Sequence, residues 1–228
     1  MQTAIEPTTT KKTRPRKTEF KVNELSEDAK QEVLDRHRYR DVEDFEWWDC
    51  TYTDFEEDAK AKGFEIGTRT VKTTKDKTYQ ELEIYFSGFC SQGDGASFAG
   101  TVDLDKYIRA HLEDLIKAGI DIFTLRKILN NEPSTSDWEA ETPIITQGGR
   151  YCHENTMDIS FNWRGETPPE IDKAFTQMRD FILEDARDLA KELYKKLEAE
   201  HDYLTSDEVV IESLNANDEK FTRDGEDI

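Results

Sequence analysis

Hydrophobic residues follow a helical period in the first part of the chain and a two-residue period after it. Residues 23–40 and 44–63 place apolar side chains three or four positions apart, which predicts two amphipathic helices. Ser26 is a suitable N-cap for the first helix, and Gly63 is a suitable end for the second. Residues 80–88 then alternate apolar and polar side chains, which predicts a strand with one solvent-facing side.

A glycine-rich stretch, FSGFCSQGDGASFAG at residues 86–100, follows this strand and interrupts the regular patterns. A second glycine-turned hairpin is predicted further along, where Met157, Ile159 and Phe161 alternate with polar residues. The remaining elements follow from the same two periods: strands at 64–73 (the expected partner of 80–88), 96–102, 142–151 and 155–163, and helices at 104–119 and 123–131.

The longest helical pattern covers residues 167–204, where Thr167 is a suitable cap and Pro168 suits the first helical position. After it, the motif TSDE at residues 205–208 predicts a capping box with Thr205 as the N-cap of a short final helix. The expected buried stripe of the long helix is Ile171, Phe175, Met178, Ile182, Leu189, Leu193 and Leu197.

These elements predict an α+β fold, because strands and helices do not alternate regularly. We expect an antiparallel sheet of about four to six strands packed against several helices, including one long C-terminal helix. The expected organisation is a disordered basic tail at 1–21, a single α+β domain at 22–216, and an acidic, frayed C-terminus at 217–228.

The chain is strongly acidic: it has 31 Lys and Arg residues and 51 Asp and Glu residues, which give a net charge of -20. Residues 1–21 carry +4 and the rest of the chain -24, so the body should repel nucleic acid and anionic membranes. The sequence has no long apolar run and no signal-peptide pattern, which predicts a cytosolic protein. Cys50, Cys90 and Cys152 lack paired spacing and are expected to be free thiols.

The first candidate site is the glycine-rich loop, whose glycines let backbone N–H groups approach a ligand. Neither a Walker motif nor GxGxxG opening a helix is present, so dinucleotide binding of the usual kind is not expected. The alternative is a plain hairpin, because an Asp-Gly pair between strands is a strong turn signal. The candidate ligand-binding residues here are Ser87, Ser91, Gln92, Gly93, Asp94, Gly95 and Ser97.

The second candidate site is the run RYCHEN, which adds Arg150, Tyr151, His153 and Asn155 to the ligand-binding set. Arg150 could bind an anionic group, Tyr151 could stack on a ring, and Asn155 could recognise polar edges. If the two hairpins are neighbours, their polar sides converge on one pocket. The alternative is a solvated hairpin tip.

Catalysis and metal binding have weaker support. His153, with Asp94 or Glu154, is a weak acid–base candidate. Cys152 beside His153 does not suggest a nucleophile and base, since adjacent residues of a strand point to opposite faces. No metal site and no cofactor are predicted, because no ligand spacing supports one.

Four segments resemble a family of uncharacterised proteins of tailed bacteriophages: WWDCTYTDFEEDAKAKGFEI, IYFSGFCSQGDGASFAG, GRYCHENTMDISF and LEAEHDYLTSDEVVIESLNANDEKFTRDG. Some members carry the automatic label "antitoxin of toxin-antitoxin stability system". The resemblance covers roughly residues 20–225 and is closest around the FSGFxSQGDGASF motif. Cys90 departs from it, since an aromatic residue is often found there. The resemblance implies an accessory phage protein in the cytoplasm of an infected bacterium, and strengthens the case for a site at the hairpins.

The first functional hypothesis is a non-catalytic binding protein that counters a host defence or toxin system by holding a small polar, nucleotide-like ligand. The second is an acidic mimic of nucleic acid that inhibits a basic host protein; the third is an enzyme with an unfamiliar His/Asp site. A homodimer is the default oligomer. The acids of the long helix that motivate the mimic are Glu170, Asp172, Asp180, Glu184, Asp185, Asp188, Glu192, Glu198 and Glu200.

Overall fold

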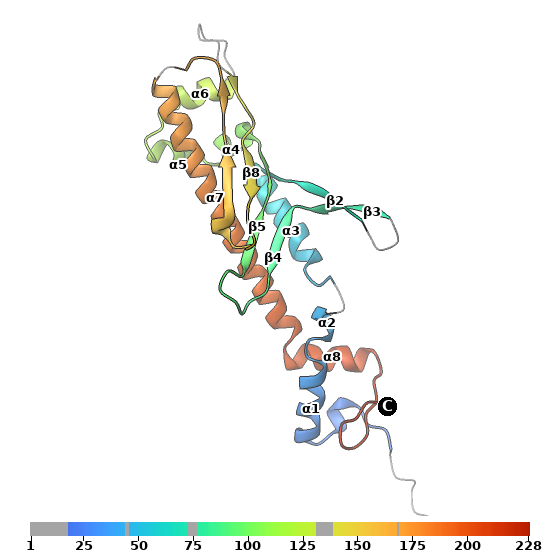
Figure 1. The fold of residues 1–228 in the computed structure, drawn as a ribbon. Helices are drawn as coiled ribbons and strands as arrows, with labels where there is room; N and C mark the ends of the chain where they lie inside the picture. The colour runs from blue at the N-terminus through green and yellow to red at the C-terminus, as the bar shows by residue number, and fades with distance from the viewer. Residues whose placement is uncertain (1–17, 44–45, 73–76, 131–138, 168) are drawn as a thin grey trace, which may run out of the picture. The chain divides into compact units, whose positions relative to one another are not determined.

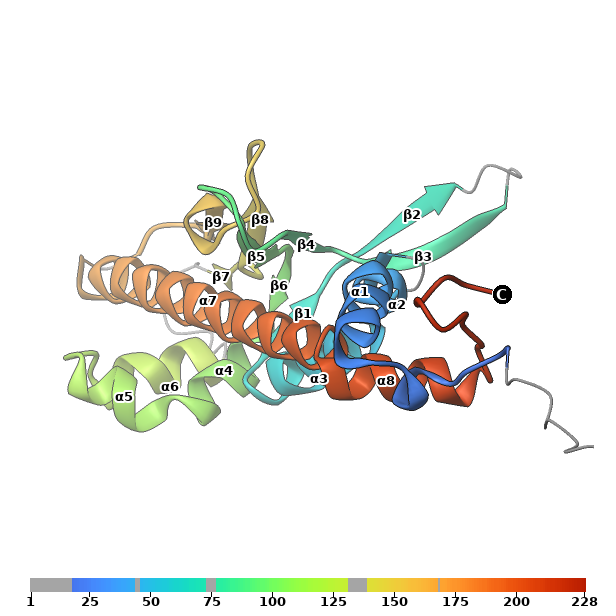
Figure 2. The same ribbon diagram turned by 90° about the horizontal axis from the view of Figure 1, so that it is seen from below.

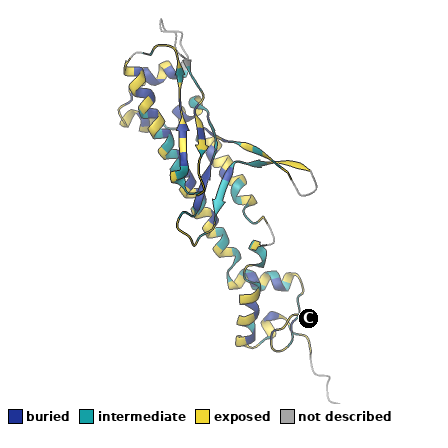
Figure 3. Ribbon diagram, in the orientation of Figure 1, coloured by how far each residue is buried: buried dark blue, intermediate teal, exposed yellow. Residues whose placement is uncertain are grey.

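The computed structural model confirms an α+β fold: a four-stranded antiparallel sheet, several helices and one long C-terminal helix, α7 (Pro169–Leu204) (Figure 1). The predicted buried stripe of α7 is confirmed, since the seven residues predicted to form it are all buried. Figure 3 shows buried and exposed positions alternating along this helix. The structure describes residues 18–43, 46–72, 77–130, 139–167 and 169–228.

The chain divides into two compact units, whereas we expected a single domain at 22–216 from the sequence. The first unit combines residues 1–45 with 202–228, and the second contains residues 46–201. Each unit has its own buried hydrophobic cluster, and no residue belongs to both clusters. The sequence pattern could not show this division, because the first unit joins segments from opposite ends of the chain.

The first unit includes the C-terminal segment 217–228, which we expected to be frayed. Phe221 is fully buried there, and its backbone forms an antiparallel bridge with Phe20. Most of the expected disordered tail, residues 1–17, lies outside the described residues. The elements of this unit are the 3-10 helix η1 (Val22–Glu24) and the helices α1 (Glu27–His37), α2 (Arg40–Glu43) and α8 (Asp207–Ala216).

The N-caps differ in part from the predictions. Ser206, rather than Thr205, caps α8, and its side chain accepts a hydrogen bond from the N–H of Val209 at 3.4 Å. Ser26 is the N-cap residue of α1, as expected, but its side chain makes no capping hydrogen bond. The predicted first-position proline of α7, Pro168, lies outside the described residues.

Three extended segments of the second unit each contain two strands separated by one residue, and each segment pairs with a different segment on the two sides of that residue. The separating residues are Gly67, Glu83 and Ala99, and backbone hydrogen bonds of 2.7–2.9 Å join them to one another. The predicted pairing of 64–73 with 80–88 therefore holds only for β2 with β3. The other antiparallel pairs are β1 with β6 and β4 with β5. The strands are β1 (Phe64–Ile66), β2 (Thr68–Lys72), β3 (Thr78–Leu82), β4 (Ile84–Ser87), β5 (Gly95–Phe98) and β6 (Gly100–Val102).

The second predicted hairpin extends the main sheet. Strands β8 (Ile144–Gln147) and β9 (Met157–Ser160) pair antiparallel, and the strand order is β1-β6-β8-β9. A short 3-10 helix, η2 (Glu154–Thr156), lies in the connecting loop. A separate pair of short strands, β7 (Glu139–Ala140) and β10 (Trp163–Arg164), lies beyond the sheet.

Helices lie beside the main sheet of the second unit, while the β2–β3 hairpin projects away from them (Figure 1). Figure 2 shows α7 beside the strands, with α4–α6 on its other side. The predicted helix at 104–119 is broken at His111 into two helices, and Gly119 ends the second with φ +93°. The remaining helices of this unit are α3 (Asp49–Ala61), α4 (Leu104–Ala110), α5 (Leu112–Lys117) and α6 (Ile122–Asn130).

Candidate functional site

The glycine-rich loop, which joins β4 to β5, is held in shape by Asp94. One carboxylate oxygen of Asp94 accepts hydrogen bonds from the backbone N–H groups of Cys90 (2.9 Å) and Ser91 (2.6 Å). The backbone N–H of Asp94 in turn donates to the carbonyl of Ser91 at 3.0 Å. A side chain that satisfies two loop N–H groups mimics a backbone turn. Asp94 therefore has a structural role in the loop.

An aromatic cluster anchors the same loop. Phe89 packs against Phe86, Trp47, Tyr194 and His201, with ring centroids 5.0–6.4 Å apart. The hydroxyl of Tyr194, on α7, donates to the carbonyl of Gly88 at 3.2 Å. These contacts fix the base of the loop while its tip, with Gln92, stays exposed.

The second loop, between β8 and β9, is held by its own side chains. The Gln147 amide donates to the carbonyl of Tyr151 at 2.8 Å, and the Thr156 hydroxyl donates to the carbonyl of His153 at 2.7 Å. The Nδ1 atom of His153 accepts a hydrogen bond from the N–H of Asn155 at 3.2 Å, so His153 caps η2. In this arrangement the neutral imidazole carries its proton on Nε2.

The two loops touch at two glycines. A Cβ atom added to Gly93 would lie 2.5 Å from Cδ1 of Tyr151, and one added to Gly95 would lie 2.5 Å from Cα of His153. Gly93 also has φ +100°, a conformation that favours glycine. The two glycines are therefore explained by the close approach of the second loop.

An open cavity of about 550 Å³, which we call the hairpin pocket, lies where the loops meet. Tyr151 is 51% exposed, and its ring lies nearly parallel to that of His153, with centroids 6.1 Å apart. The lining residues come from both loops: Gln92, Gly93, Asp94, Tyr151, His153, Glu154 and Asn155.

Five predicted site residues do not line this pocket. Ser97 is fully buried, and its hydroxyl has no hydrogen-bond partner among the described residues. Gly95 is buried beneath His153, while Ser87, Ser91 and Arg150 are outside the lining. Arg150, the expected anion-binding residue, is exposed.

One lining residue was absent from the predicted ligand-binding set. Glu154 lies between His153 and Asn155, and its carboxylate accepts a hydrogen bond from the Asn155 amide at 2.8 Å. Its place within the polar run RYCHEN was the signal available in the sequence. The described lining contains the carboxylates of Asp94 and Glu154 and no Lys or Arg, so the pocket favours neutral or cationic groups over anions.

A smaller pocket of about 240 Å³ has one residue of the second loop, Cys152, in its lining. Cys152 lines it while His153 lines the hairpin pocket, as expected for consecutive residues of an extended chain. Arg69 binds Glu81 at 3.1 Å and lies 5.1 Å from the ring centroid of Tyr85. Burial raises the pKa of Tyr52, and the charge of Glu81 raises this pKa further. The remaining lining residues are Trp48, Ile84 and Phe86.

A third cavity, of about 320 Å³, lies beside β6 at the start of α4. Glu65 and Asp103 are among its lining residues, and Lys106 bridges their carboxylates at 3.5 and 2.9 Å. The hydrogen bond from Lys106 lowers the pKa of Asp103. Lys106 therefore offsets part of the negative charge of this cavity.

Several acids of α7 are engaged by nearby side chains. Asp185 accepts a hydrogen bond from the Tyr107 hydroxyl and lies 3.4 Å from Nδ1 of His111. Burial raises the pKa of Tyr107, and the hydrogen bond with Asp185 raises it further. The other ion pairs of these acids join Asp180 to Arg179, Glu184 to Arg187, Asp188 to Lys191 and Glu192 to Lys62.

The described part of the chain shows neither a metal site nor a membrane-spanning helix. No group of three or more His, Cys, Asp or Glu side chains there is arranged to hold a metal ion. The three cysteines are free thiols. Among the described helices, none combines the length and apolar character needed to cross a membrane.

The fold and the pocket define an α+β protein with an open polar cavity between two hairpin loops. The chain belongs to the family described as "Domain of unknown function (DUF8835)", whose model matches residues 47–207, a range that contains both loops. No curated protein and no solved structure matches the chain.

Proposed function

We propose that this protein is a non-catalytic binding protein that holds a small polar ligand in the hairpin pocket. The observation that carries the proposal is the convergence of two loops, about 60 residues apart in sequence, on one cavity of about 550 Å³. That volume lies within the range of small-molecule sites. Both loops are internally hydrogen-bonded, so a ligand would meet a largely preformed surface.

The roles of Asp94 and His153 favour binding over turnover. One carboxylate oxygen of Asp94 accepts hydrogen bonds from two loop N–H groups, and the Nδ1 lone pair of His153 accepts one from the N–H of Asn155. Neither acceptor is therefore available as a catalytic base. The neutral ring of His153 therefore carries an N–H donor at Nε2 rather than a basic lone pair. A donor of this kind suits recognition of a carbonyl or ring nitrogen on the ligand.

The carboxylates of the pocket favour a neutral or cationic polar ligand, such as a nucleobase or a nucleoside without phosphate. Tyr151 offers an aromatic face, and Gln92 and Asn155 offer amides. The carboxylate of Glu154 could accept a hydrogen bond from an amino group of the ligand. Arg150 lies outside the lining, so the pocket lacks the cation that a phosphate would need.

The biological setting is part of the proposal and is supported by the resemblance to tailed-phage proteins. We place the protein in the cytoplasm of an infected bacterium, where binding a signal molecule would counter a host defence or toxin system. Sequestration requires no turnover, in keeping with the roles of Asp94 and His153.

Native mass spectrometry of the protein purified from infected or defence-activated cells tests the proposal. We expect a small-molecule adduct on the wild-type protein. The double variant Gln92→Ala, Asn155→Ala should lose the adduct, because it removes both amides from the lining.

Arg150→Gln is the matched control, since Arg150 belongs to the same loop but is exposed and outside the lining. This variant should keep the adduct. An adduct that survives the double variant, or a folded wild-type protein that carries none, would contradict the proposal.

A further inference from the structure

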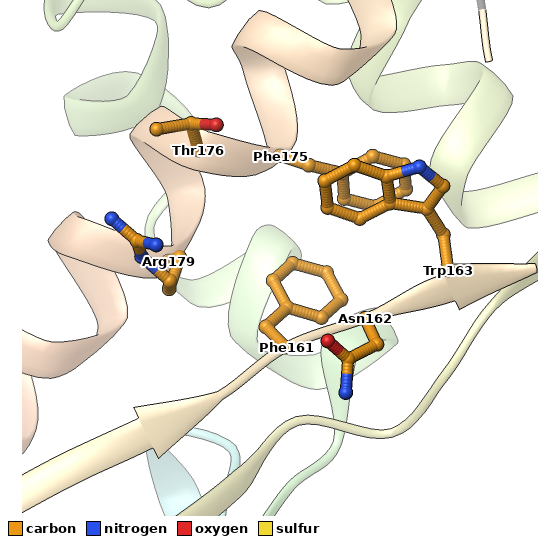
Figure 4. A pocket seen from close by; sticks show the side chains of 6 residues that line it. All are labelled: Phe161, Asn162, Trp163, Phe175, Thr176 and Arg179. Atoms are coloured by element: carbon orange, nitrogen blue, oxygen red, sulfur yellow. The ribbon is translucent and has the colours of Figure 1, made fainter.

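A separate cavity of about 340 Å³ lies between the strand β10 and the start of α7. Figure 4 shows Phe161, Asn162 and Trp163 contributed by the strand side, and Phe175, Thr176 and Arg179 by the helix. We call it the Arg179 pocket. None of its described lining residues belongs to the hairpin pocket, so binding at the Arg179 pocket would not depend on the proposed function.

The Arg179 pocket differs in charge from the three pockets described above. Each of those has at least one carboxylate in its lining, whereas the described lining of this pocket contains an arginine and no acid. The single charged side chain described in this lining is therefore a guanidinium, in a chain with a net charge of -20. It favours an anionic group on a ligand.

Arg179 keeps donors for such a group. Its Nε and Nη2 atoms donate to one carboxylate oxygen of Asp180, at 3.0 and 2.7 Å. Guanidinium has five N–H donors, so this pair leaves others to bind an anion. Both side chains are largely exposed, at 46% and 63%, so the pair is weak and can rearrange.

The other wall of the pocket is aromatic. The indole of Trp163 stacks on the ring of Phe175 with centroids 4.8 Å apart and an interplanar angle of 8°. Phe161 meets Phe175 edge-on at 5.0 Å, and both phenylalanines are buried. Trp163 is only half-buried, so its indole offers apolar surface for a flat ring.

We propose that the Arg179 pocket binds a small flat ligand that carries an anionic group, with the ring against Trp163 and the anion on Arg179. The Asn162 amide donates one N–H to the Ser160 hydroxyl at 3.1 Å and keeps a second N–H for the ligand. The Thr176 hydroxyl donates to the carbonyl of Asp172 at 3.1 Å, so its oxygen remains as an acceptor. A nucleoside monophosphate and an aromatic carboxylate share this chemistry, so the test uses both.

The test is NMR titration of the full-length protein with adenosine monophosphate, benzoate, adenosine and inorganic phosphate, following the indole N–H of Trp163. We expect saturable binding of at least one of the first two probes. The two ligands differ in their anion, so the stronger one identifies phosphate or carboxylate as the preferred group. Arg179→Gln should weaken that binding about tenfold or more, because a charge-assisted hydrogen bond is lost.

Lys195→Gln is the matched control. It removes the same charge from an exposed position of α7, about 24 Å further along the helix at 1.5 Å per residue. This variant should bind as the wild type does, and unchanged amide spectra away from the pocket would show that both variants are folded.

Three results would overturn the proposal. The first is no saturable binding of either adenosine monophosphate or benzoate. The second is equal affinity in the wild type and Arg179→Gln. The third is adenosine or phosphate alone binding as tightly as the best complete probe, since the site would then recognise only half of the ligand.

Discussion

At the scale of single residues, glycines decide how closely the two hairpin loops approach. Gly93 and Gly95 were predicted as ligand contacts, because glycines expose backbone N–H groups. The structure gives them a different reason: Tyr151 and His153 occupy the space of the missing side chains. The sequence could mark these positions as special, but the loop that lies against them is about 60 residues away in the chain.

Gly95→Ala should lower the free energy of unfolding by about 1–3 kcal/mol, because the new methyl group would overlap the backbone of His153. Urea unfolding followed by tryptophan fluorescence measures this change. Gly148→Ala is the control, since nothing lies within 4 Å of a Cβ added there. Equal effects of the two substitutions would contradict the contact between the loops.

At the scale of elements, helix positions followed from periodicity, while caps and strand partners did not. The seven-residue stripe of α7 is buried as predicted, because a 3.6-residue period is a local property. Thr205 and Ser206 are both good capping residues, and only the path of the chain after α7 selects Ser206. The change of strand partners at Gly67, Glu83 and Ala99 likewise depends on tertiary contacts, because it requires three separate segments to lie side by side.

Ser206→Ala should destabilise α8 by about 1 kcal/mol, because the N–H of Val209 loses its acceptor. Hydrogen exchange at Val209 should become faster, and chemical denaturation gives the free energy. Ser26→Ala is the matched control, since Ser26 occupies the N-cap of α1 without a side-chain bond. If Ser26→Ala is as costly as Ser206→Ala, the assigned cap of α8 is wrong.

At the scale of the whole molecule, the chain forms two units with separate cores. The first core contains Val22, Val33, Leu34, Val210, Leu214 and Phe221, which come from the two ends of the chain. The larger core belongs to residues 46–201. The basic tail that we expected to be disordered precedes the first core, and residues 1–17 lie outside the described part.

Phe221→Ala should destabilise the first unit by about 3–5 kcal/mol, because a fully buried phenylalanine is removed from a small core. Hydrogen exchange should speed up in α1 and α8, while the amides of β5 in the second unit keep their protection. Phe98→Ala, in the core of the second unit, should show the reverse pattern. Equal loss of protection in both units after either substitution would contradict the division into two units.

The sequence by itself determined the α+β class, the long helix with its buried stripe, and the two glycine-containing hairpins. These features depend on local periods and turn residues, which are readable from neighbouring positions. Only the tertiary structure decided that Gln92, Asp94, Tyr151, His153 and Asn155 share a pocket, that Glu154 joins them and that Arg150 does not. The division into two units and the existence of the Arg179 pocket were likewise visible only in the tertiary structure. The physical reason is that packing brings together residues far apart in sequence, and no local pattern records which of them will touch.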